Sequence, residues 1–214
     1  MIEMLEVGNM KLYYSKGACS LAPHIVLQEL GIPFETVSVD WSGKSGEELS
    51  KLNPMGAVPT LVLDDGQSLT EGAAIVQYLA DLKPSAKLAP ANGTPERYRL
   101  QEALNFIASE LHKGFNPLFT LDLLSKDPAV QGAVATYAKA DLGRKFDVVS
   151  QKLGDRTTLL PSGYSVADAY LFTVLTWTGF VGIDLKPWPT LTRFMDTMRA
   201  RPAVQAAMKA EHII

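Results

Sequence analysis

Short apolar runs alternate with helical patterns in the chain up to about Pro84. Residues 10–14 (MKLYY) predict a strand, and residues 20–31 (SLAPHIVLQELG) predict a helix ended by Gly31. Residues 34–40 (FETVSVD) alternate apolar and polar positions, which is typical of a half-buried strand. Residues 58–70 predict two short strands around the Asp65-Gly66 turn, and residues 71–82 a further helix. With a short helix expected near 47–52, the pattern predicts a small α/β sheet covered by helices.

The strand pattern ends at the linker, and only helical patterns follow it. Residues 96–119, 128–154 and 165–182 each predict a helix, and residues 188–212 predict two helices broken before Pro202. Residues 84–94, rich in Pro, Ala and Gly, are the expected linker. The sequence therefore predicts an α/β domain over residues 10–86 and an all-α domain over residues 94–214. Residues 1–9 are interpreted as an N-terminal extension.

Composition narrows the classes of function. The chain has 214 residues, 47% of them hydrophobic, and a formal net charge of −3. This mild acidity argues against nucleic-acid binding, which depends on clustered Lys and Arg contacts to phosphate. No apolar run approaches the roughly 20 residues that span a bilayer, and the first residues lack the basic region of a secretory signal. A soluble protein that binds neither membranes nor nucleic acid is expected.

Cysteine and histidine usage points to a reducing compartment and argues against a metal site. Cys19 is the only cysteine, so an internal disulfide and a cysteine-rich metal site are excluded. The three histidines, His24, His112 and His212, lie far apart and show no ligand spacing. We therefore expect a cytoplasmic protein without a metal.

Cys19 stands where the first strand turns into the first predicted helix. Unpaired N–H groups and the helix dipole favour negative charge at such a position, and they can lower the pKa of a cysteine thiol. A reactive thiolate is one interpretation. The alternative is that Cys19 is a small buried apolar residue, as free cysteines often are. With no second cysteine nearby, any redox role would need a thiol from outside the chain.

Two further stretches suggest a ligand site without establishing one. Pro59 directly precedes a predicted strand, and a cis bond after Val58 would leave the backbone of Val58 free to pair with an extended peptide. Most X–Pro bonds are trans, so the residues alone do not favour this arrangement. Glu71 and Gly72 open a helix, where they are either ordinary capping residues or a site for an ammonium and a carboxylate.

The helix predicted at 96–119 carries a polar flank beside its apolar stripe. Asn105, Ser109 and His112 recur at helical spacing, and they are either a solvated flank or one wall of a cleft. The stripe itself is formed by Leu100, Leu104, Ile107, Ala108 and Leu111. Further along, Ser165 and Asp168 predict a capping box that starts a helix and serves folding. The aromatic residues of 170–180 are interpreted as core, although a few could line an apolar pocket.

Five motifs in this order resemble a cytosolic glutathione S-transferase, with the bacterial beta class as the nearest match. They are KLYYSKGACSLAPHIVLQELGIPF, NPMGAVPTLVLDDG, LTEGAAIVQYLAD, LNFIASELHKGF and SVADAYLF. The resemblance covers nearly all of residues 10–214. It implies a thioredoxin-like N-terminal domain with a cis-proline at Pro59, an all-helical C-terminal domain and a homodimer. It also implies glutathione as co-substrate, with no metal or organic cofactor.

The resemblance also implies site residues. Cys19 matches the beta-class cysteine that faces the glutathione sulfur, and His112 becomes the candidate for handling a proton or stabilising the thiolate. The other matched positions, expected to contact glutathione, are Lys44, Val58, Glu71, Gly72, Asn105, Ser109, Glu110 and Leu111. Some of these contacts reach across the dimer in the family. Some family members have Ser where Gly72 stands, so a hydroxyl contact is missing here.

Three neighbours of the expected site are given supporting roles. Tyr14 matches the position of a catalytic tyrosine in other classes, and we interpret it as structural. Ser20 is a rival hydroxyl donor or a helix cap, and His24 is expected to be packed or hydrogen-bonded.

The expected function is conjugation of the glutathione thiolate to small, apolar, electrophilic substrates. The alternative within enzymes is thiol–disulfide exchange or peroxide reduction through Cys19. The alternative of another class is a non-catalytic protein on the same fold that binds a ligand or a partner. The residues do not identify the electrophile.

Overall fold

The computed structural model describes residues 10–214, so the expected extension at 1–9 lies outside the described residues. The described chain divides into two compact units. One contains the chain up to Ala91 together with Ala200–Ile214, and the other contains Asn92–Arg199. The predicted fold class is confirmed, because a mixed α/β unit is followed by an all-helical one. The contacts group the last helix with the sheet unit, whereas the sequence pattern assigns it to the helical domain.

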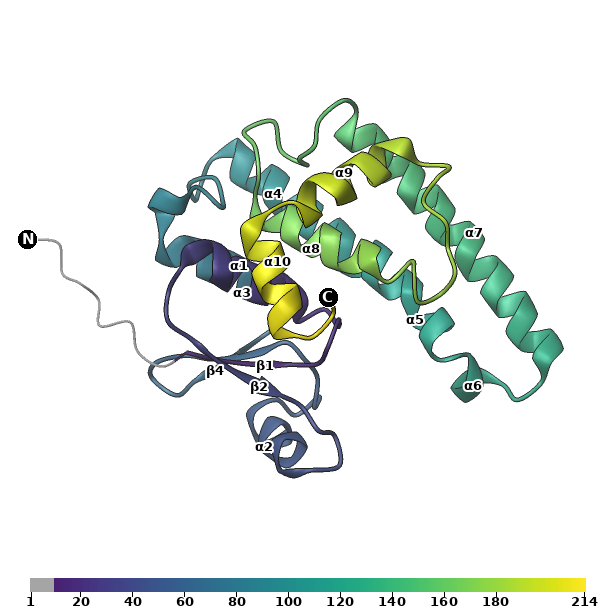
Figure 1. The fold of residues 1–214 in the computed structure, drawn as a ribbon, viewed down its shortest axis with the longest axis horizontal. Coiled ribbons are helices and arrows are strands. Elements are labelled where there is room, and N and C mark those ends of the chain that lie inside the picture. The colour runs from purple at the N-terminus through teal and green to yellow at the C-terminus, as the bar shows by residue number, and fades with distance from the viewer. Residues whose placement is uncertain (1–9) are drawn as a thin grey trace, which may run out of the picture. The chain divides into compact units, whose positions relative to one another are not determined.

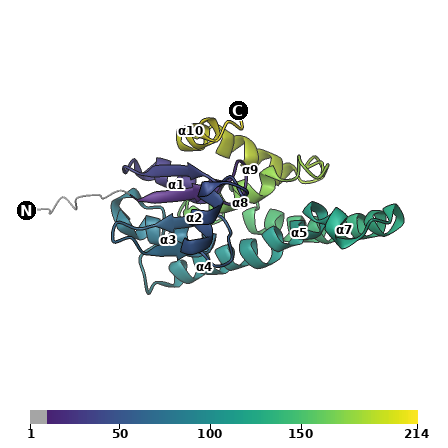
Figure 2. The ribbon, with the colours of Figure 1, turned by 90° about the horizontal axis from the view of Figure 1, so that it is seen from below.

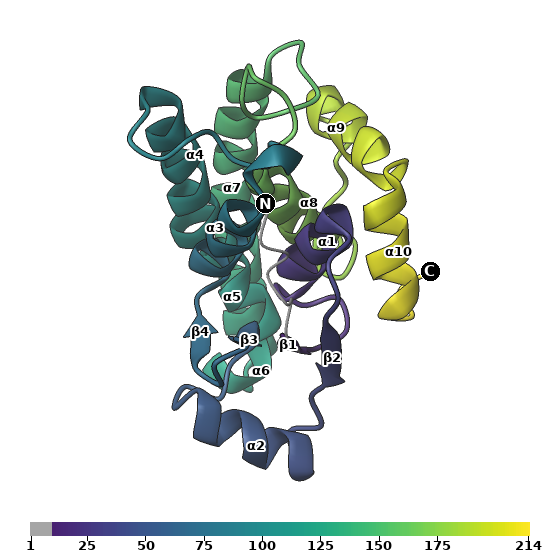
Figure 3. The ribbon, with the colours of Figure 1, turned by 90° about the vertical axis from the view of Figure 1, so that its left-hand side faces the viewer.

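The first unit is built on a four-stranded sheet with the order β2-β1-β3-β4. The central strand β1 pairs in parallel with β2 and antiparallel with β3, and β3 and β4 form the predicted antiparallel hairpin. Helices α1 and α3 lie on one face of the sheet and α2 on the other (Figures 1 and 3). The elements are β1 (Lys11–Tyr14), α1 (Leu21–Leu30), β2 (Glu35–Ser38), α2 (Lys44–Leu52), β3 (Thr60–Val62), β4 (Ser68–Thr70), α3 (Gly72–Leu82), η1 (Pro84–Ala86) and α10 (Pro202–Ala210).

Helix α1 is the buried centre of this unit. Residues 21–27 are all buried, because α1 packs against both α3 and α10. A helix that is apolar on every side is buried all round, and the sequence SLAPHIVLQEL has that character. Gly31 ends α1 in a left-handed conformation with φ 59°, and its N–H bonds to the carbonyls of Leu27 and Gln28. Because α1 packs against helices on several sides, the end of the loop that precedes it is fixed in position.

The second unit consists of helices, as predicted. Its longest helix, α7, runs beside α5 (Figure 2), while α8 is buried from Val166 to Leu175. The expected breaks at residue 154 and before Pro202 are present. The elements are α4 (Pro95–Phe106), η2 (Ile107–His112), α5 (Lys113–Phe119), α6 (Leu121–Leu124), α7 (Pro128–Leu153), α8 (Val166–Thr176) and α9 (Pro189–Arg199).

One segment of the helical unit departs from the prediction. The helix expected at 96–119 runs from α4 into α5, but η2 between them is wound as a π-helix. The wider turn places one more residue in each turn, so later side chains are displaced by about 100° relative to an unbroken α-helix. His112 therefore does not share a face with Asn105 and Ser109 as the regular helical period predicts.

Candidate active site

Cys19 lies in a short loop that connects β1 to α1 and is closed by its own hydrogen bonds. The Ser20 hydroxyl accepts a hydrogen bond from the Ser15 N–H (3.2 Å) and donates one to the Ser15 carbonyl (3.3 Å). Ser20 is the N-cap residue of α1, as one interpretation expects, but its side chain makes no capping hydrogen bond. Its buried hydroxyl instead fixes the loop, which places Cys19 one residue before the N-cap.

The thiol of Cys19 points at the main chain beside β3. Its Sγ donates a hydrogen bond to the Val58 carbonyl across 3.1 Å, and Cys19 is only half-buried. The Val58–Pro59 peptide bond is cis, as the family resemblance implies. Cys19 and the Val58 backbone therefore meet at one point of the structure. This is the arrangement required if a bound peptide pairs with Val58 while its own sulfur faces Cys19.

Two effects act in opposite directions on the Cys19 thiol. The N-terminus of α1 favours a negative charge beside it. The hydrogen bond to Val58 is available only while the sulfur carries its proton, and it therefore stabilises the neutral thiol. A ligand that takes over the Val58 carbonyl would remove the second effect and leave the first.

The loop before Cys19 is hydrogen-bonded to a buried carboxylate, Glu211, that the sequence analysis did not predict. Glu211 Oε2 accepts a hydrogen bond from the Gly17 N–H at 2.9 Å, and Glu211 Oε1 lies 2.9 Å from His24 Nδ1. The side chains of His24 and Glu211 are 1% and 0% exposed. His24 is hydrogen-bonded, as expected. Glu211 directly follows α10. Its two oxygens contact residues on both sides of Cys19 in the sequence, Gly17 before it and His24 after it.

Glu71 and Gly72 stand at the start of α3. Glu71 has a φ of 66°, which is rare for a residue with a side chain and is found preferentially at functional sites. Its carbonyl accepts hydrogen bonds from the N–H groups of Ala74 and Ile75, and its side chain is exposed. The unusual φ sets the direction in which the exposed Glu71 side chain leaves the backbone at the start of α3. Lys44 opens α2; its side chain is 89% exposed and its Nζ lies 3.7 Å from Glu48 Oε1.

The other expected contacts belong to the helical unit. Asn105 and Ser109 are exposed, whereas Leu111 is fully buried in the core. The Glu110 side chain faces α7, where its Oε2 lies 3.3 Å from Lys145 Nζ. Of these residues, Asn105 and Ser109 have side chains open to a ligand, while the side chains of Glu110 and Leu111 already have partners within the unit.

His112 is half-buried against two aromatic residues of the same unit. Its Nδ1 lies 2.8 Å from the Tyr170 hydroxyl, and its ring meets the ring of Trp177 edge-on at a centroid distance of 4.7 Å. Burial, and to a smaller extent the neighbouring charge of Lys113, lower the pKa of His112 to about 4. His112 is therefore neutral near pH 7. Tyr170 occupies Nδ1, so Nε2 is the ring nitrogen that remains for a ligand.

An aromatic cluster continues from His112. Trp177 also meets Phe115 and Phe119 edge-on, at centroid distances of 5.6 and 5.7 Å. Tyr170 and Trp177 are buried, as the core interpretation expects, whereas Phe119 is 49% exposed. His112 thus lies in an apolar environment within the helical unit.

Comparisons with known proteins decide the family. The N-terminal and C-terminal domain models of glutathione S-transferases match residues 17–82 and 106–202. The glutathione S-transferase GstA of Escherichia coli O157:H7 is 46% identical over 207 residues, covering 94% of this chain and 98% of that protein. This chain belongs to the glutathione S-transferase family.

Solved structures of this family support the beta-class resemblance. The beta-class glutathione S-transferase of Sphingomonas chungbukensis is 42% identical, with a TM-score of 0.87 over 95% of this chain and 100% of that one. A sphingomonad glutathione S-transferase solved in complex with glutathione is 41% identical, with a TM-score of 0.85 over 95% of this chain and 100% of that one. The beta class is thus the part of the glutathione S-transferase family to which this chain is similar.

In this glutathione S-transferase, Ser165 and Asp168 form the capping box of α8. One oxygen of the buried Asp168 carboxylate accepts from the N–H and the hydroxyl of Ser165, at 2.8 and 2.9 Å. The other accepts from the Leu159 N–H at 2.7 Å. Asp168 therefore joins the preceding loop to α8, the helix that carries Tyr170.

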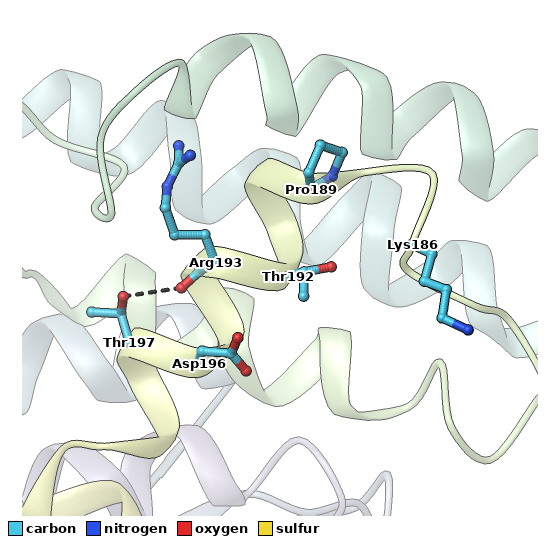
Figure 4. A pocket seen from close by; sticks show the side chains of 6 residues that line it. All are labelled: Lys186, Pro189, Thr192, Arg193, Asp196 and Thr197. Carbon is cyan, nitrogen blue, oxygen red and sulfur yellow. Dashed lines mark hydrogen bonds between the residues drawn. The ribbon is translucent and has the colours of Figure 1, made fainter.

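A surface pocket elsewhere in the helical unit contains none of the expected site residues. It has a volume of about 470 Å³ and is lined by Lys186, Pro189, Thr192, Arg193, Asp196 and Thr197. Its charged groups diverge, and the hydrogen bond drawn among the lining side chains runs from the Thr197 hydroxyl to the Arg193 carbonyl, one turn earlier on the same helix (Figure 4). We find no converging donors there that would define a ligand.

The described residues contain neither a cluster of metal-ligating side chains nor a helix suited to span a membrane. Within residues 10–214, His, Cys, Asp and Glu do not gather in a group of three or more that could hold a metal ion. Over the same range, none of the helices combines the length and apolar character needed to cross a membrane.

Proposed function

We propose that this glutathione S-transferase activates the glutathione thiol and transfers it to small apolar electrophiles. The observation that carries the proposal is the 3.1 Å contact between Cys19 and the Val58 carbonyl. A peptide whose backbone pairs with Val58 would bring its cysteinyl sulfur close to Cys19. Glutathione is such a peptide, and the relative solved with glutathione shares the fold over nearly the whole chain.

The first unit would bind most of the tripeptide. Glu71 would receive the ammonium of the γ-glutamyl end, and the backbone N–H at Gly72 its carboxylate, since a helix N-terminus favours anions. Val58 would pair with the cysteinyl backbone. Lys44, which is highly exposed, is free to move toward the other carboxylate of glutathione.

Asn105, Ser109 and His112 would orient glutathione through their side chains, whereas the side chains of Glu110 and Leu111 already have partners within their own unit. We assign thiolate stabilisation to His112 rather than proton abstraction, because a group with a pKa of about 4 is a weak base at neutral pH. If the Tyr170 hydroxyl donates to Nδ1, then Nε2 carries the proton and can donate to the thiolate. Some of these contacts are proposed to cross the interface of a homodimer.

The chemistry needs no group beyond glutathione itself. The thiol loses its proton to solvent, and the thiolate attacks the electrophilic carbon of the substrate. With an aryl halide, a carbon–sulfur bond forms and the halide leaves with the bonding electron pair. We propose glutathione as co-substrate, with no metal or organic cofactor, and a cytoplasmic location where glutathione is abundant. The aromatic residues beside His112 favour an apolar second substrate.

Thiol–disulfide exchange is the second candidate, favoured by the half-exposed Cys19 thiol. The Cys19 thiolate would attack the glutathione sulfur of a mixed disulfide and release the other thiol. A second glutathione thiolate would then attack the Cys19–glutathione disulfide, yielding glutathione disulfide and free Cys19. The sum is one mixed disulfide plus glutathione, giving one thiol plus glutathione disulfide.

The deciding experiment measures both reactions on one preparation. Conjugation is followed with glutathione and 1-chloro-2,4-dinitrobenzene, and exchange with a glutathione mixed disulfide. We expect saturable conjugation that is competed by S-methylglutathione. The proposal would be overturned if calorimetry detected no binding of glutathione or S-methylglutathione and neither assay showed turnover. That result would favour the non-catalytic alternative.

A further inference from the structure

The π-helical segment η2 is held in place from two neighbouring helices. From α8, Tyr170 contacts His112 at 2.8 Å. From α7, Lys145 contacts Glu110 twice: Nζ donates to the Glu110 carbonyl at 3.1 Å and lies 3.3 Å from Glu110 Oε2. Glu110 and His112, both in the second half of η2, therefore each have a partner on a neighbouring helix.

Lys145 is itself fixed on α7. Its Nζ lies 2.8 Å from Asp141 Oδ2, one turn earlier on the same helix, and its side chain is only 19% exposed. Three oxygen atoms thus surround one ammonium group. A lysine with a single surface partner contributes little, but one that is largely buried and shared among several partners is held in one geometry.

The residues just after η2 leave little room for another arrangement. A Cβ atom at Gly114 would lie 2.9 Å from Leu142 Cδ2 and 3.5 Å from Lys145 Nζ. Leu142 is fully buried, so α5 begins in close contact with α7. Lys145 thus lies where η2 passes into α5 and where Gly114 of α5 packs tightly against α7.

The two contacts select the same winding of the segment. If η2 relaxed to an α-helix, side chains after the change would be displaced by about 100°. Such a displacement would carry the Glu110 carbonyl away from Lys145 and turn His112 off Tyr170. The contacts of Lys145 with Glu110 therefore also determine the direction of the His112 ring.

We propose that Lys145 is a positioning residue for His112. It holds the π-helical winding through Glu110, and it thereby keeps the imidazole on Tyr170 with Nε2 directed outward. This inference rests on the proposed function, in which His112 stabilises the glutathione thiolate. Lys145 itself touches neither glutathione nor the second substrate in this assignment.

Three variants test the role of Lys145. Lys145→Met keeps most of the side-chain volume and removes the charge and the donors, whereas Lys145→Arg keeps both. Lys152→Met is the matched control, because Lys152 also lies on α7 and pairs with a glutamate, Glu102 at 3.3 Å, but that partner precedes η2. The three full-length proteins are compared for conjugation kinetics, thermal unfolding and His112 imidazole signals in long-range 1H–15N spectra, assigned with His112→Gln.

We expect Lys145→Met to lower kcat about fivefold while the KM for glutathione stays within twofold. Its His112 signals should show a mixture of tautomers, where the wild type shows one. Lys145→Arg should restore both properties, and Lys152→Met should resemble the wild type in both. A Lys145→Met protein with the wild-type His112 spectrum, or with no larger loss of kcat than Lys152→Met, would overturn the inference.

The spectra separate this inference from the proposed function. If the wild type does not conjugate glutathione, the proposed function fails, while the tautomer signals still show whether Lys145 holds His112. If conjugation is present and the spectra do not respond to Lys145→Met, the proposed function stands and the inference fails.

Discussion

The Cys19 thiol donates a hydrogen bond to the Val58 carbonyl across 3.1 Å, between the start of α1 and the residue that precedes β3. These residues are 39 positions apart in the chain, and the fold brings them together at the point where a bound peptide is proposed to lie. The contact links the only cysteine of the sequence to the proposed binding edge. The role of its sulfur can therefore be tested by substituting Cys19.

Replacing Cys19 should separate the two proposed reactions. We expect Cys19→Ala to abolish thiol–disulfide exchange, because the attacking sulfur is gone, while conjugation to an aryl halide falls by less than about tenfold. Cys19→Ser is the matched control, since it keeps a donor for the Val58 carbonyl but cannot exchange. Both activities are measured on the same samples. Loss of conjugation in Cys19→Ala together with its retention in Cys19→Ser would assign the sulfur a role as hydrogen-bond donor only.

Removing the Glu71 carboxylate should weaken glutathione binding. An interaction between a carboxylate and an ammonium typically contributes about 1.5–3 kcal/mol, so Glu71→Ala should raise the KM for glutathione roughly 10- to 100-fold with a smaller change in kcat. Alanine also has a Cβ, so the unusual φ of 66° costs about the same in both proteins. Glu71→Gln, which keeps the shape without the charge, should lie between them. An unchanged KM in Glu71→Ala would contradict the assigned site.

The buried pair of His24 and Glu211 should be important for stability. Glu211→Ala removes a buried carboxylate that both His24 and the Gly17 N–H contact, and the loss of one member of a buried pair costs about 3–5 kcal/mol of the free energy of unfolding. Urea titration followed by circular dichroism measures it. The control is Glu29→Ala, which breaks the partly exposed pair with Arg201 between α1 and the start of α10. That change should cost no more than about 1 kcal/mol. Equal effects of the two variants would refute the role given to Glu211.

His112 should make stability depend on pH in mildly acidic solution. Its pKa is about 4 in the folded protein and about 6.5 when unfolded, so the unfolded state binds more protons between these values. Stability from this group is complete above pH 6.5, falls as the pH drops toward 4 and is lost below that. The loss should not exceed about 3–4 kcal/mol, which corresponds to the full difference between the two pKa values.

The measurement for His112 is the free energy of unfolding at several pH values, in the wild type and in His112→Gln. The difference between their slopes isolates this group from His24 and His212. The same neutrality predicts that His112 adds no step to the profile of kcat/KM between pH 5 and 8. A step that disappears in His112→Gln would show that His112 is protonated in that range.

Much of the fold follows from local patterns in the sequence. Several element boundaries are set by local backbone preferences that do not depend on the rest of the fold. They lie at Gly31, at the Asp65-Gly66 turn and at Pro202. The apolar character of residues 21–30 and 166–175 predicts helices buried on all sides. The winding of η2 has no such local signal, because it depends on contacts with α7 and α8. The regular helical period therefore misplaced His112.

The supporting residues of the site were harder to predict for the same reason. Glu211 is 194 positions from Gly17, and Lys145 is 35 positions from Glu110. An acidic residue near a chain end and a lysine on a long helix look like ordinary surface residues in the sequence. Only burial distinguishes Glu211, and only the close approach of α5 to α7 distinguishes Lys145. Residues of local motifs, such as Cys19 and Glu71, could be named in advance.

The bond from Glu211 to Gly17 also bears on how the protein forms during translation. The ribosome produces the strands of the sheet and α1 early, but α10 and Glu211 emerge only after the whole helical unit. Until then the buried imidazole of His24 and the loop before Cys19 have no carboxylate to bind. Although domains usually fold from the N-terminus as they emerge, the half of this protein that is made first should be the last to reach its final structure.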